Sequence, residues 1–243
     1  MPTVYGTFVA AGCVTGVLWL ERRRERLGLD ENGFWIAIWL MVLGAVVGAK
    51  GLFVVLGWEH YARGELRFWR DFGVGFVFFG GLAGAALAGL AYARWRRLSF
   101  VRGADYFAVA VPLGHAIGRV GCFFAGCCAG HPPHPVQLYE SAGLLLIAWA
   151  ASSVLARVET GALAPGTAFR TYLGLYGLLR FALDPLRADG RPERFLGLSH
   201  QQGIALALIA VALAWPWLVR MATSLGSSTT STSSSSRDGR QLA

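Results

Sequence analysis

One segment of the chain, residues 114–140, holds most of the side chains that could carry out chemistry. It contains three of the four cysteines and three of the five histidines, together with one arginine and one glutamate. Long apolar stretches with almost no charge flank it, and it reads GHAIGRVGCFFAGCCAGHPPHPVQLYE. So dense a group of reactive side chains in an apolar chain is the first candidate for a functional site.

Two arginines lie inside apolar stretches of the sequence. Arg119 follows Gly118, and Arg180 precedes Asp184 by four residues. An ionisable side chain within a membrane helix is energetically expensive, so we expect each arginine to face a polar cavity or a partner. Guanidinium groups match phosphate oxygens in bidentate fashion, and two at similar depth indicate a shared phosphate. In the alternative interpretation, Arg180 pairs with Asp184 one turn away and Arg119 extends to the membrane interface.

Cys122, Cys127 and Cys128, with His131 and His134 close behind them, allow three interpretations. Thiolate and imidazole are ligands that zinc prefers, although the spacing lacks the paired CxxC of common structural zinc sites. A disulfide can form outside the cytoplasm, but the two adjacent cysteines are poorly placed to pair with each other. Buried, inert thiols are the third interpretation. The sequence leaves all three open, and we assign no metal site from it.

Further polar residues lie on either side of the cysteines. His115 is four residues before Arg119 and is expected to share its helix face, with a structural hydrogen bond as its simplest role. Gln137, Tyr139 and Glu140 stand at the predicted start of the next helix, near the outer membrane interface. Tyr139 could also belong to the belt of aromatic residues found at membrane surfaces.

The composition indicates that these residues are positioned by membrane helices. Apolar residues make up 55% of the chain and charged residues 15%, and the mean hydropathy is +0.49. These values are typical of an integral membrane protein. In a soluble protein the net charge of +8 would suggest nucleic acid binding, but here arginines cluster between apolar runs, where they anchor helix ends at anionic lipid. No nucleic acid partner is therefore expected.

The sequence predicts an all-α fold with about seven membrane-spanning helices, because crossing ~30 Å of hydrocarbon takes about 20 mostly apolar residues. The predicted spans are roughly Val4–Leu20, Phe34–Gly57, Gly73–Ala93, Ala104–Phe124, Val136–Ala156, Ala168–Leu183 and Gln201–Val219. We expect residues 1–222 to form one membrane domain. The serine- and threonine-rich residues 223–243 cannot bury a core and are expected to form a disordered cytoplasmic tail.

Arginines between the predicted helices indicate the orientation. Glu21–Arg26 and Arg94–Arg102 lie on one side, which the positive-inside rule makes cytoplasmic. Seven crossings then place the N-terminus outside and the C-terminus in the cytoplasm. On this prediction the cysteine-rich segment and the loop at Asp184–Leu198 face the extracytoplasmic side.

Four landmarks in the sequence resemble a known family. They are Tyr5-Gly6; Gly48-Ala49-Lys50, where the family has Gly-Ala-Arg; a signature block of Asp105, Gly118-Arg119-Val120-Gly121-Cys122-Phe123 through Gly130 and His134-Pro-Val-Gln-Leu-Tyr-Glu140; and Arg180-Phe-Ala-Leu-Asp184 with Arg187-Ala-Asp189 and Ser199-His200-Gln201. The signature block followed by the second arginine motif is the specific part of this pattern. Through most of Tyr5–Val219, the chain resembles the bacterial prolipoprotein diacylglyceryl transferases.

This resemblance implies a reaction and a location. A diacylglyceryl group passes from phosphatidylglycerol to the lipobox cysteine thiol of a preprolipoprotein, in the inner membrane and without a cofactor. The implied partners are phosphatidylglycerol, preprolipoprotein signal segments and membrane lipid. By resemblance, Arg119, Arg180 and Tyr5 are the catalytic residues. The implied substrate-binding residues are Gly80, Gly81, His115, Gly118, Cys122, Gly130, Gln137, Tyr139, Glu140 and Asp184.

The chain departs from the family pattern at three positions. Phe79 stands where the third helix of the family carries histidine, Cys122 replaces an asparagine, and Cys127 replaces an acidic residue. The arginines that would grip phosphate are retained, whereas the groups that would handle protons are altered; His115 or His134 could supply a base. The departures favour two alternatives: a non-catalytic relative that binds anionic phospholipid or lipoprotein signal segments, and a membrane enzyme with a metal or redox site at the cysteines. We also hypothesise a Cys122–Cys127 disulfide beside Arg119.

Overall fold

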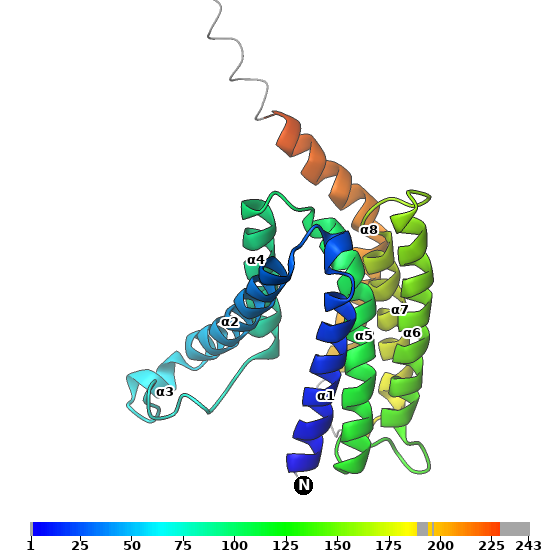
Figure 1. The fold of residues 1–243 in the computed structure, drawn as a ribbon. Coiled ribbons are helices and arrows are strands. Elements are labelled where there is room, and N and C mark those ends of the chain that lie inside the picture. The colour runs from blue at the N-terminus through cyan, green and yellow to red at the C-terminus, as the bar shows by residue number, and fades with distance from the viewer. Residues whose placement is uncertain (1, 189–193, 196, 229–243) are drawn as a thin grey trace, which may run out of the picture. The chain divides into compact units, whose positions relative to one another are not determined.

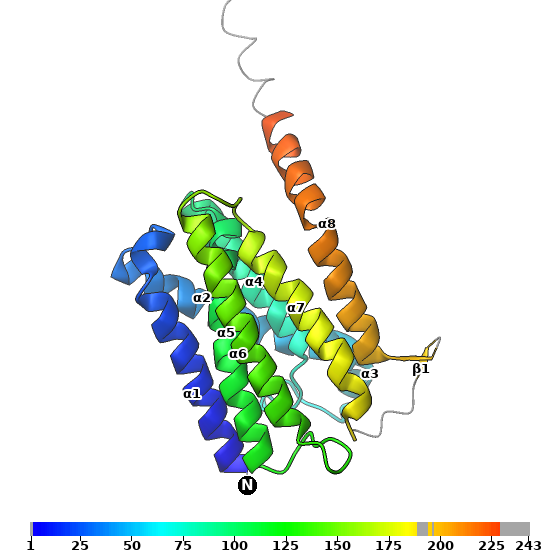
Figure 2. The same cartoon turned by 90° about the vertical axis from the view of Figure 1, so that its right-hand side faces the viewer.

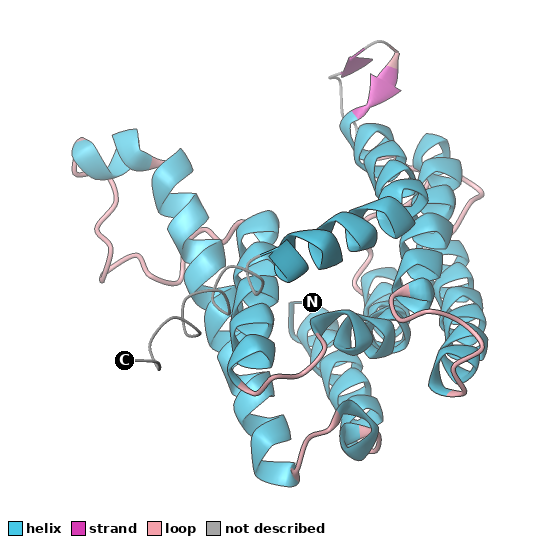
Figure 3. Ribbon diagram, turned by 90° about the horizontal axis from the view of Figure 1, so that it is seen from above, coloured by secondary structure: helices cyan, strands magenta, loops and turns pink. Residues whose placement is uncertain are grey.

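The protein is described here by a computed structural model covering residues 2–188, 194–195 and 197–228. Within these residues the fold is helical, apart from one pair of two-residue strands (Figure 3). The elements are α1 (Pro2–Glu21), η1 (Arg24–Leu27), α2 (Glu31–Leu56), α3 (Trp58–Ala62), α4 (Phe78–Trp95), α5 (Phe100–Phe124), α6 (Val136–Glu159), α7 (Thr167–Leu183), η2 (Asp184–Leu186), β1 (Arg194–Phe195), β2 (Leu198–Ser199) and α8 (His200–Ser228). The chain divides into two compact units, Met1–Gly16 with Asp105–Ala243 and Val17–Ala104.

The first unit packs the start of α1 with α5, α6, α7 and α8 (Figure 1). α1 and α5 approach closely at a pair of glycines: a Cβ added at Gly114 would lie 2.6 Å from the carbonyl oxygen of Gly12. Such small residues let membrane helices pack backbone to backbone. α7 contacts both α6 and α8, as Figure 2 shows. This packing brings α5, α6 and α7 together, and these helices carry most of the candidate site.

Asp105, at the start of the signature block, fixes α7 against α5. Its fully buried carboxylate accepts hydrogen bonds from the backbone N–H groups of Gly166 (2.6 Å) and Phe169 (2.9 Å). The first N–H groups of a helix lack partners within the helix, and a carboxylate there also interacts favourably with the helix dipole. Asp105 therefore caps α7 from a neighbouring helix and helps to set the position of Arg180.

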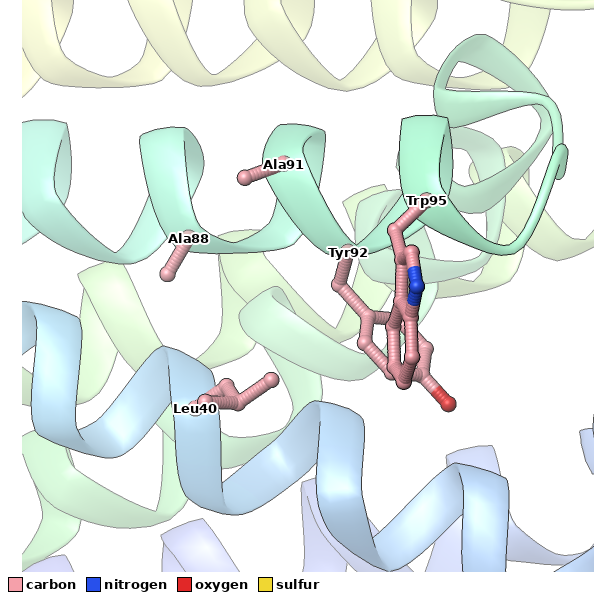
Figure 4. A pocket seen from close by; sticks show the side chains of 5 residues that line it. All are labelled: Leu40, Ala88, Ala91, Tyr92 and Trp95. Carbon is pink, nitrogen blue, oxygen red and sulfur yellow. The ribbon is translucent and has the colours of Figure 1, made fainter.

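The second unit is organised by α2 and α4. A Cβ added at Gly80 would lie 2.7 Å from the Cβ of Leu52, so the two helices are in close contact there. Between the same helices lies a pocket of about 280 Å³ lined by Leu40, Ala88, Ala91, Tyr92 and Trp95 (Figure 4). Its lining carries no charged group, so the pocket does not suit the phosphate chemistry expected from the sequence.

Lys50 is buried in the second unit and holds the loop that precedes α4. Its ammonium donates hydrogen bonds to the carbonyl oxygens of Asp71 (3.2 Å) and Val74 (2.8 Å). Four phenylalanine rings lie around it, with centroids 5.2 to 6.0 Å from the ammonium nitrogen, so cation–π attraction adds to these bonds. In the same loop, the Arg70 guanidinium and then the Arg67 backbone N–H donate to the Asp71 carboxylate and lower its pKa.

Every predicted span contains a helix, and the all-α prediction is confirmed. Among the described residues, α1, α2, α5 and α6 are long and apolar enough to cross a membrane. The number of seven crossings and the orientation remain predictions. The third predicted span begins too early, since α4 starts at Phe78 rather than Gly73. The residues before Phe78 are not helical, because Gly75 has a positive φ of 73° and the Lys50 ammonium binds the carbonyl oxygens of Asp71 and Val74.

The predicted C-terminal tail falls largely outside the described residues. α8 is helical to Ser228, which overlaps residues 223–228 of the expected tail. Residues 229–243 lie outside the described part of the chain, so the tail and the domain boundary at 222 stay predictions.

Candidate functional site

Three arginines converge on the carboxylate of Glu140. Glu140 lies in the first turns of α6 and is buried, with 3% of its surface exposed. Arg119 of α5 donates a short hydrogen bond to its Oε2 atom. The same oxygen lies 3.4 Å from Nη1 of Arg187, which follows η2, and 3.9 Å from Nη1 of Arg180 in α7. We call Arg119, Arg180, Arg187, Glu140 and Asp184 the arginine cluster.

The arginine cluster gathers buried charged groups of both signs. Three guanidinium groups lie near the Glu140 carboxylate, and Asp184 Oδ1 lies 3.8 Å from Nη2 of Arg180. Arg119 and Arg180 are each only 8% exposed, and the Arg119 Nε is a buried donor without a hydrogen-bond partner among the described residues. Buried charge with an unused donor is the arrangement that an anionic oxygen would stabilise.

These contacts bear on both interpretations of the arginines, and the shared phosphate stays a prediction. Arg119 and Arg180 do meet at one site, and the group they share in the structure is the Glu140 carboxylate. The i,i+4 pair of Arg180 with Asp184 is also present. Arg119 does not extend to the interface as the alternative required, because its side chain is buried among α5, α6 and α7.

Asp184 is held from the other side by the segment before α8. The Ser199 hydroxyl donates a short hydrogen bond to Oδ2 of Asp184. The other oxygen of the carboxylate remains directed to Arg180. Asp184 therefore links the end of α7 to β2, and its role in substrate binding stays a prediction.

His115 lies on the face of α5 that carries Arg119, as expected from its spacing. Its Nε2 atom is 3.8 Å from Oε1 of Glu140, which is ion-pair distance rather than hydrogen-bond distance. Its ring packs against Tyr176 of α7, with centroids 5.8 Å apart. The histidine therefore borders the carboxylate that the arginines share.

The loop between α5 and α6 is tied to the end of α7. Gly130 and Arg187 form an isolated antiparallel bridge, and a Cβ at Gly130 would lie 2.5 Å from the His134 carbonyl oxygen and 2.8 Å from that of Leu186. No side chain fits in this space, which gives the motif glycine a structural reason. The bridge sets the backbone at Arg187 and so helps to aim its guanidinium at Glu140.

The three clustered cysteines lie next to Arg119. Cys122 is in the last turn of α5 and is buried, and Arg119 Nη1 donates to its sulfur at 3.9 Å. The sulfur atoms of Cys122, Cys127 and Cys128 all lie within 4.8 Å of one another. All four cysteines of the chain are free in the structure, so the hypothesised Cys122–Cys127 disulfide is not formed there. The Cys127 thiol is instead directed to the Cys122 carbonyl oxygen, 3.7 Å away.

The remaining predicted residues divide into nearby and separate positions. Gln137 is buried and donates to the Cys127 carbonyl oxygen at 2.8 Å. Tyr5 of α1 is half-exposed and lies within electrostatic range of the three cysteines and of Arg119. Tyr139 is exposed and stacks edge-on against His134, which suits an interfacial aromatic residue.

Three predicted glycines show no ligand-binding geometry of their own. Gly118 precedes Arg119 in α5, and open space surrounds the position of its missing Cβ. Gly80 and Gly81 lie in α4 of the second unit, where both approach α2 closely. Helix packing explains these two residues, and their role in lipid binding stays a prediction.

Two members of the site were not singled out from the sequence. Arg187 belongs to the second arginine motif, which by itself does not assign this residue to the site, and Ser199 only follows that motif in the sequence. The signal for Arg187 was its spacing, seven residues after Arg180 and beyond a helix-ending Asp-Pro. No local pattern pointed to the contact between Ser199 and Asp184, since 15 residues separate them.

Comparison with known proteins identifies the family of this chain. Residues 3–218 match the family described as prolipoprotein diacylglyceryl transferase. The chain is 26% identical to a phosphatidylglycerol–prolipoprotein diacylglyceryl transferase of Clostridium tetani, over 86% of this chain and 90% of that protein. It is 30% and 31% identical to proteins of the same name from Bacillus cytotoxicus and Bacillus cereus, in both cases over 85% of this chain and 84% of the relative. With the arginine cluster inside the matched region, the chain belongs to the prolipoprotein diacylglyceryl transferase family.

Proposed function

We propose that this protein transfers a diacylglyceryl group from phosphatidylglycerol to the lipobox cysteine thiol of a prolipoprotein. The new bond joins the cysteine sulfur to a glyceryl carbon, and the bond from that carbon to the phosphate oxygen breaks. Glycerol phosphate leaves with the negative charge that the thiolate brought. Family membership and the charge of the arginine cluster support this proposal.

The single observation that carries the proposal is the convergence of Arg119 and Arg180 on one buried carboxylate, with the Nε donor of Arg119 unused among the described residues. A phosphatidylglycerol phosphodiester carries one negative charge, and guanidinium groups bind phosphate oxygens in bidentate fashion. The free Nε donor of Arg119 offers a hydrogen bond to one of its oxygens. Donors already aligned in a site that excludes water stabilise the charge that develops on a leaving phosphate.

The other site residues would place the lipid around these arginines. Arg187 joins Arg119 and Arg180 in the positive face, and Glu140 keeps the three guanidinium groups together while the phosphate is absent. Tyr5, Gly130, Gln137, Tyr139 and Asp184 would border the headgroup and the glyceryl backbone, and Gly80 and Gly81 would contact lipid from α4. These assignments rest on the family motif.

We propose the membrane arrangement from the apolar spans and from the arginines that lie between them. Seven helices would cross the bacterial inner membrane, with the N-terminus outside and the C-terminus in the cytoplasm. Residues 1–222 would form the membrane domain, and the arginine cluster would open to the outer leaflet. In a variant whose native cysteines are all replaced, an impermeant thiol reagent should label a cysteine introduced at His131 and not one at Arg23 in intact spheroplasts. The reverse labelling would contradict the orientation.

The test of the function is genetic and then biochemical. The gene should restore lipoprotein lipidation in cells depleted of their own transferase, and the purified protein should transfer a diacylglyceryl group from phosphatidylglycerol to a lipobox peptide. Arg180→Ala should lose both phosphatidylglycerol binding and transfer. Lipid binding without transfer in the wild-type protein would instead favour the non-catalytic relative that Phe79, Cys122 and Cys127 raise as an alternative. Binding by Arg180→Ala at the wild-type level would refute the shared-phosphate site.

A further inference from the structure

The end of α5 and the loop after it gather three thiols at one point. Cys122, Cys127 and Cys128 have their sulfur atoms within 4.8 Å of one another. A zinc ion bound tetrahedrally at ~2.3 Å from each sulfur would set the sulfurs about 3.8 Å apart. The thiols are thus close to metal-ligand spacing, and shifts of about an ångström or less would complete it.

The backbone of the loop holds this arrangement in place. Gly126 and Cys128 both have positive φ angles, of 69° and 58°, which fold the chain back over the end of α5. The Cys127 N–H donates to the Cys122 carbonyl oxygen at 3.1 Å, and Gln137 of α6 donates to the Cys127 carbonyl oxygen. A side chain other than glycine in the left-handed region is strained, and such strain is retained where the surroundings impose it. A preformed loop lowers the entropy lost when a ligand orders it.

Charge and access also suit a metal ion. The Arg119 guanidinium lies 3.9 Å from the Cys122 sulfur, so it would stabilise the net negative charge of a dication held by three thiolates. Cys122 is buried and anchors the group, whereas Cys127 is exposed, so the cluster is reachable from outside the helices. Within the described part of the chain, no fourth histidine, cysteine or carboxylate joins the three sulfurs at this distance.

We propose that Cys122, Cys127 and Cys128 bind a zinc ion whose fourth position takes the thiol of the acceptor cysteine. Three protein ligands with an open fourth position distinguish catalytic zinc sites from closed structural ones. A thiol that coordinates zinc is held as the thiolate. The proposal rests on the transferase function above and assigns its missing step, the removal of the acceptor proton.

The step balances without any further reagent. A hydroxide at the fourth position leaves as water with the proton of the acceptor thiol, and the acceptor sulfur takes its place on zinc. This thiolate then attacks the glyceryl carbon, the carbon–oxygen bond breaks, and the phosphate held by Arg119 and Arg180 leaves as glycerol phosphate. The thioether product leaves zinc, and water, losing a proton to solvent, restores the hydroxide.

The arrangement of the arginine cluster explains why a base outside the cluster, here the hydroxide on zinc, would be useful. Both carboxylates of the arginine cluster are engaged, Glu140 by three arginines and Asp184 by Arg180 and Ser199. Taking up the proton of the acceptor thiol would remove the charge with which such a carboxylate holds its guanidinium partners. A thiolate-bound metal next to Arg119 supplies the nucleophile without drawing a carboxylate away from the arginines.

The first experiment uses the full chain, purified in detergent, stripped of metal and then given Zn²⁺ alone. We expect roughly one zinc ion per chain, with three sulfur ligands by X-ray absorption, and affinity at least roughly tenfold lower in Cys127→Ser and Cys128→Ser because each loses a ligand. Cys13→Ser is the matched control, since Cys13 lies in α1 and outside the group; it should bind zinc like wild type. No zinc uptake by wild-type protein with three alkylatable thiols overturns the proposal, as does a disulfide among them in protein purified without reductant.

The second experiment separates this proposal from the proposed function. A lipobox peptide should raise the sulfur count at zinc from three to four, and the same peptide with serine in place of cysteine should not. Transfer by metal-free protein at the wild-type rate would overturn the zinc site and leave the transferase function standing. Zinc with four sulfur ligands but no transfer from phosphatidylglycerol would refute the function and leave the metal site standing.

Discussion

Glu140→Gln tests whether one carboxylate holds the arginine cluster together. The substitution keeps the size of the side chain and removes its charge, so the three guanidinium groups would lose the carboxylate on which they converge. Removing one partner of a buried ion pair costs about 3–5 kcal/mol. Since each kcal/mol shifts the melting temperature of a chain of this size by roughly 2–4 °C, we expect a decrease of about 6–20 °C. The assay is thermal unfolding in detergent, followed by fluorescence.

Lipid should reverse part of this loss. A phosphatidylglycerol phosphate can replace the missing negative charge, so its addition should raise the melting temperature of Glu140→Gln by more than it raises that of wild type. Glu59→Gln is the control, because Glu59 is 87% exposed and its pair with Arg63 at 3.6 Å is a surface pair of small effect. The reasoning is refuted if Glu140→Gln melts like wild type, or if the lipid stabilises both proteins equally.

Three further predictions follow from the loops. Lys50→Met should destabilise the second unit, seen as faster proteolysis between α3 and α4, because two loop carbonyls lose their buried donor at about 1–3 kcal/mol each; Lys50→Arg should retain most of the protection. Because the pKa of Asp71 is lowered, its contribution to the stability of this loop is complete above the ordinary value of 3.8 and is lost as the pH falls through the lowered pKa. Pepsin should therefore cut this loop in the wild-type protein only below the lowered pKa. In Asp71→Asn, which lacks the carboxylate, pepsin should cut the loop more readily. Gly130→Ala should reduce transfer at least roughly tenfold by pushing back the Leu186 backbone, whereas Gly103→Ala, in open space on α5, should leave transfer unchanged and the helix slightly stabilised.

The helices could be predicted because their signal is local. Each of the helices α1, α2, α5 and α6 overlaps nearly all of one predicted apolar run, and the shorter α7 begins one residue before its predicted span and ends with it. The start of α4 could not be predicted from hydropathy, since Gly73–Val77 is as apolar as the helix that follows. What stops the helix there is a contact made at a distance, from Lys50 to the carbonyl of Val74.

The candidate site was predictable in its members more than in its pairing. Arg119 and Arg180 stand out because charge within an apolar run needs a reason. The role of Glu140 as their common partner does not follow from spacing, because Glu140 is 21 positions after Arg119 and 40 positions before Arg180. Only the packing of α5, α6 and α7 brings these residues to one point.

The charge of the cluster also bears on which lipid it would accept. All three guanidinium groups point toward the same carboxylate, so a headgroup phosphate entering there would bring its substituent close to positive charge. A glycerol substituent is neutral and can donate hydrogen bonds to Glu140 or Asp184. An ammonium substituent would instead be repelled by the guanidinium groups and would lose hydration without a free carboxylate to pair with, since both are already engaged. The same arrangement that makes Glu140 necessary in the free protein therefore favours an anionic lipid over a zwitterionic one.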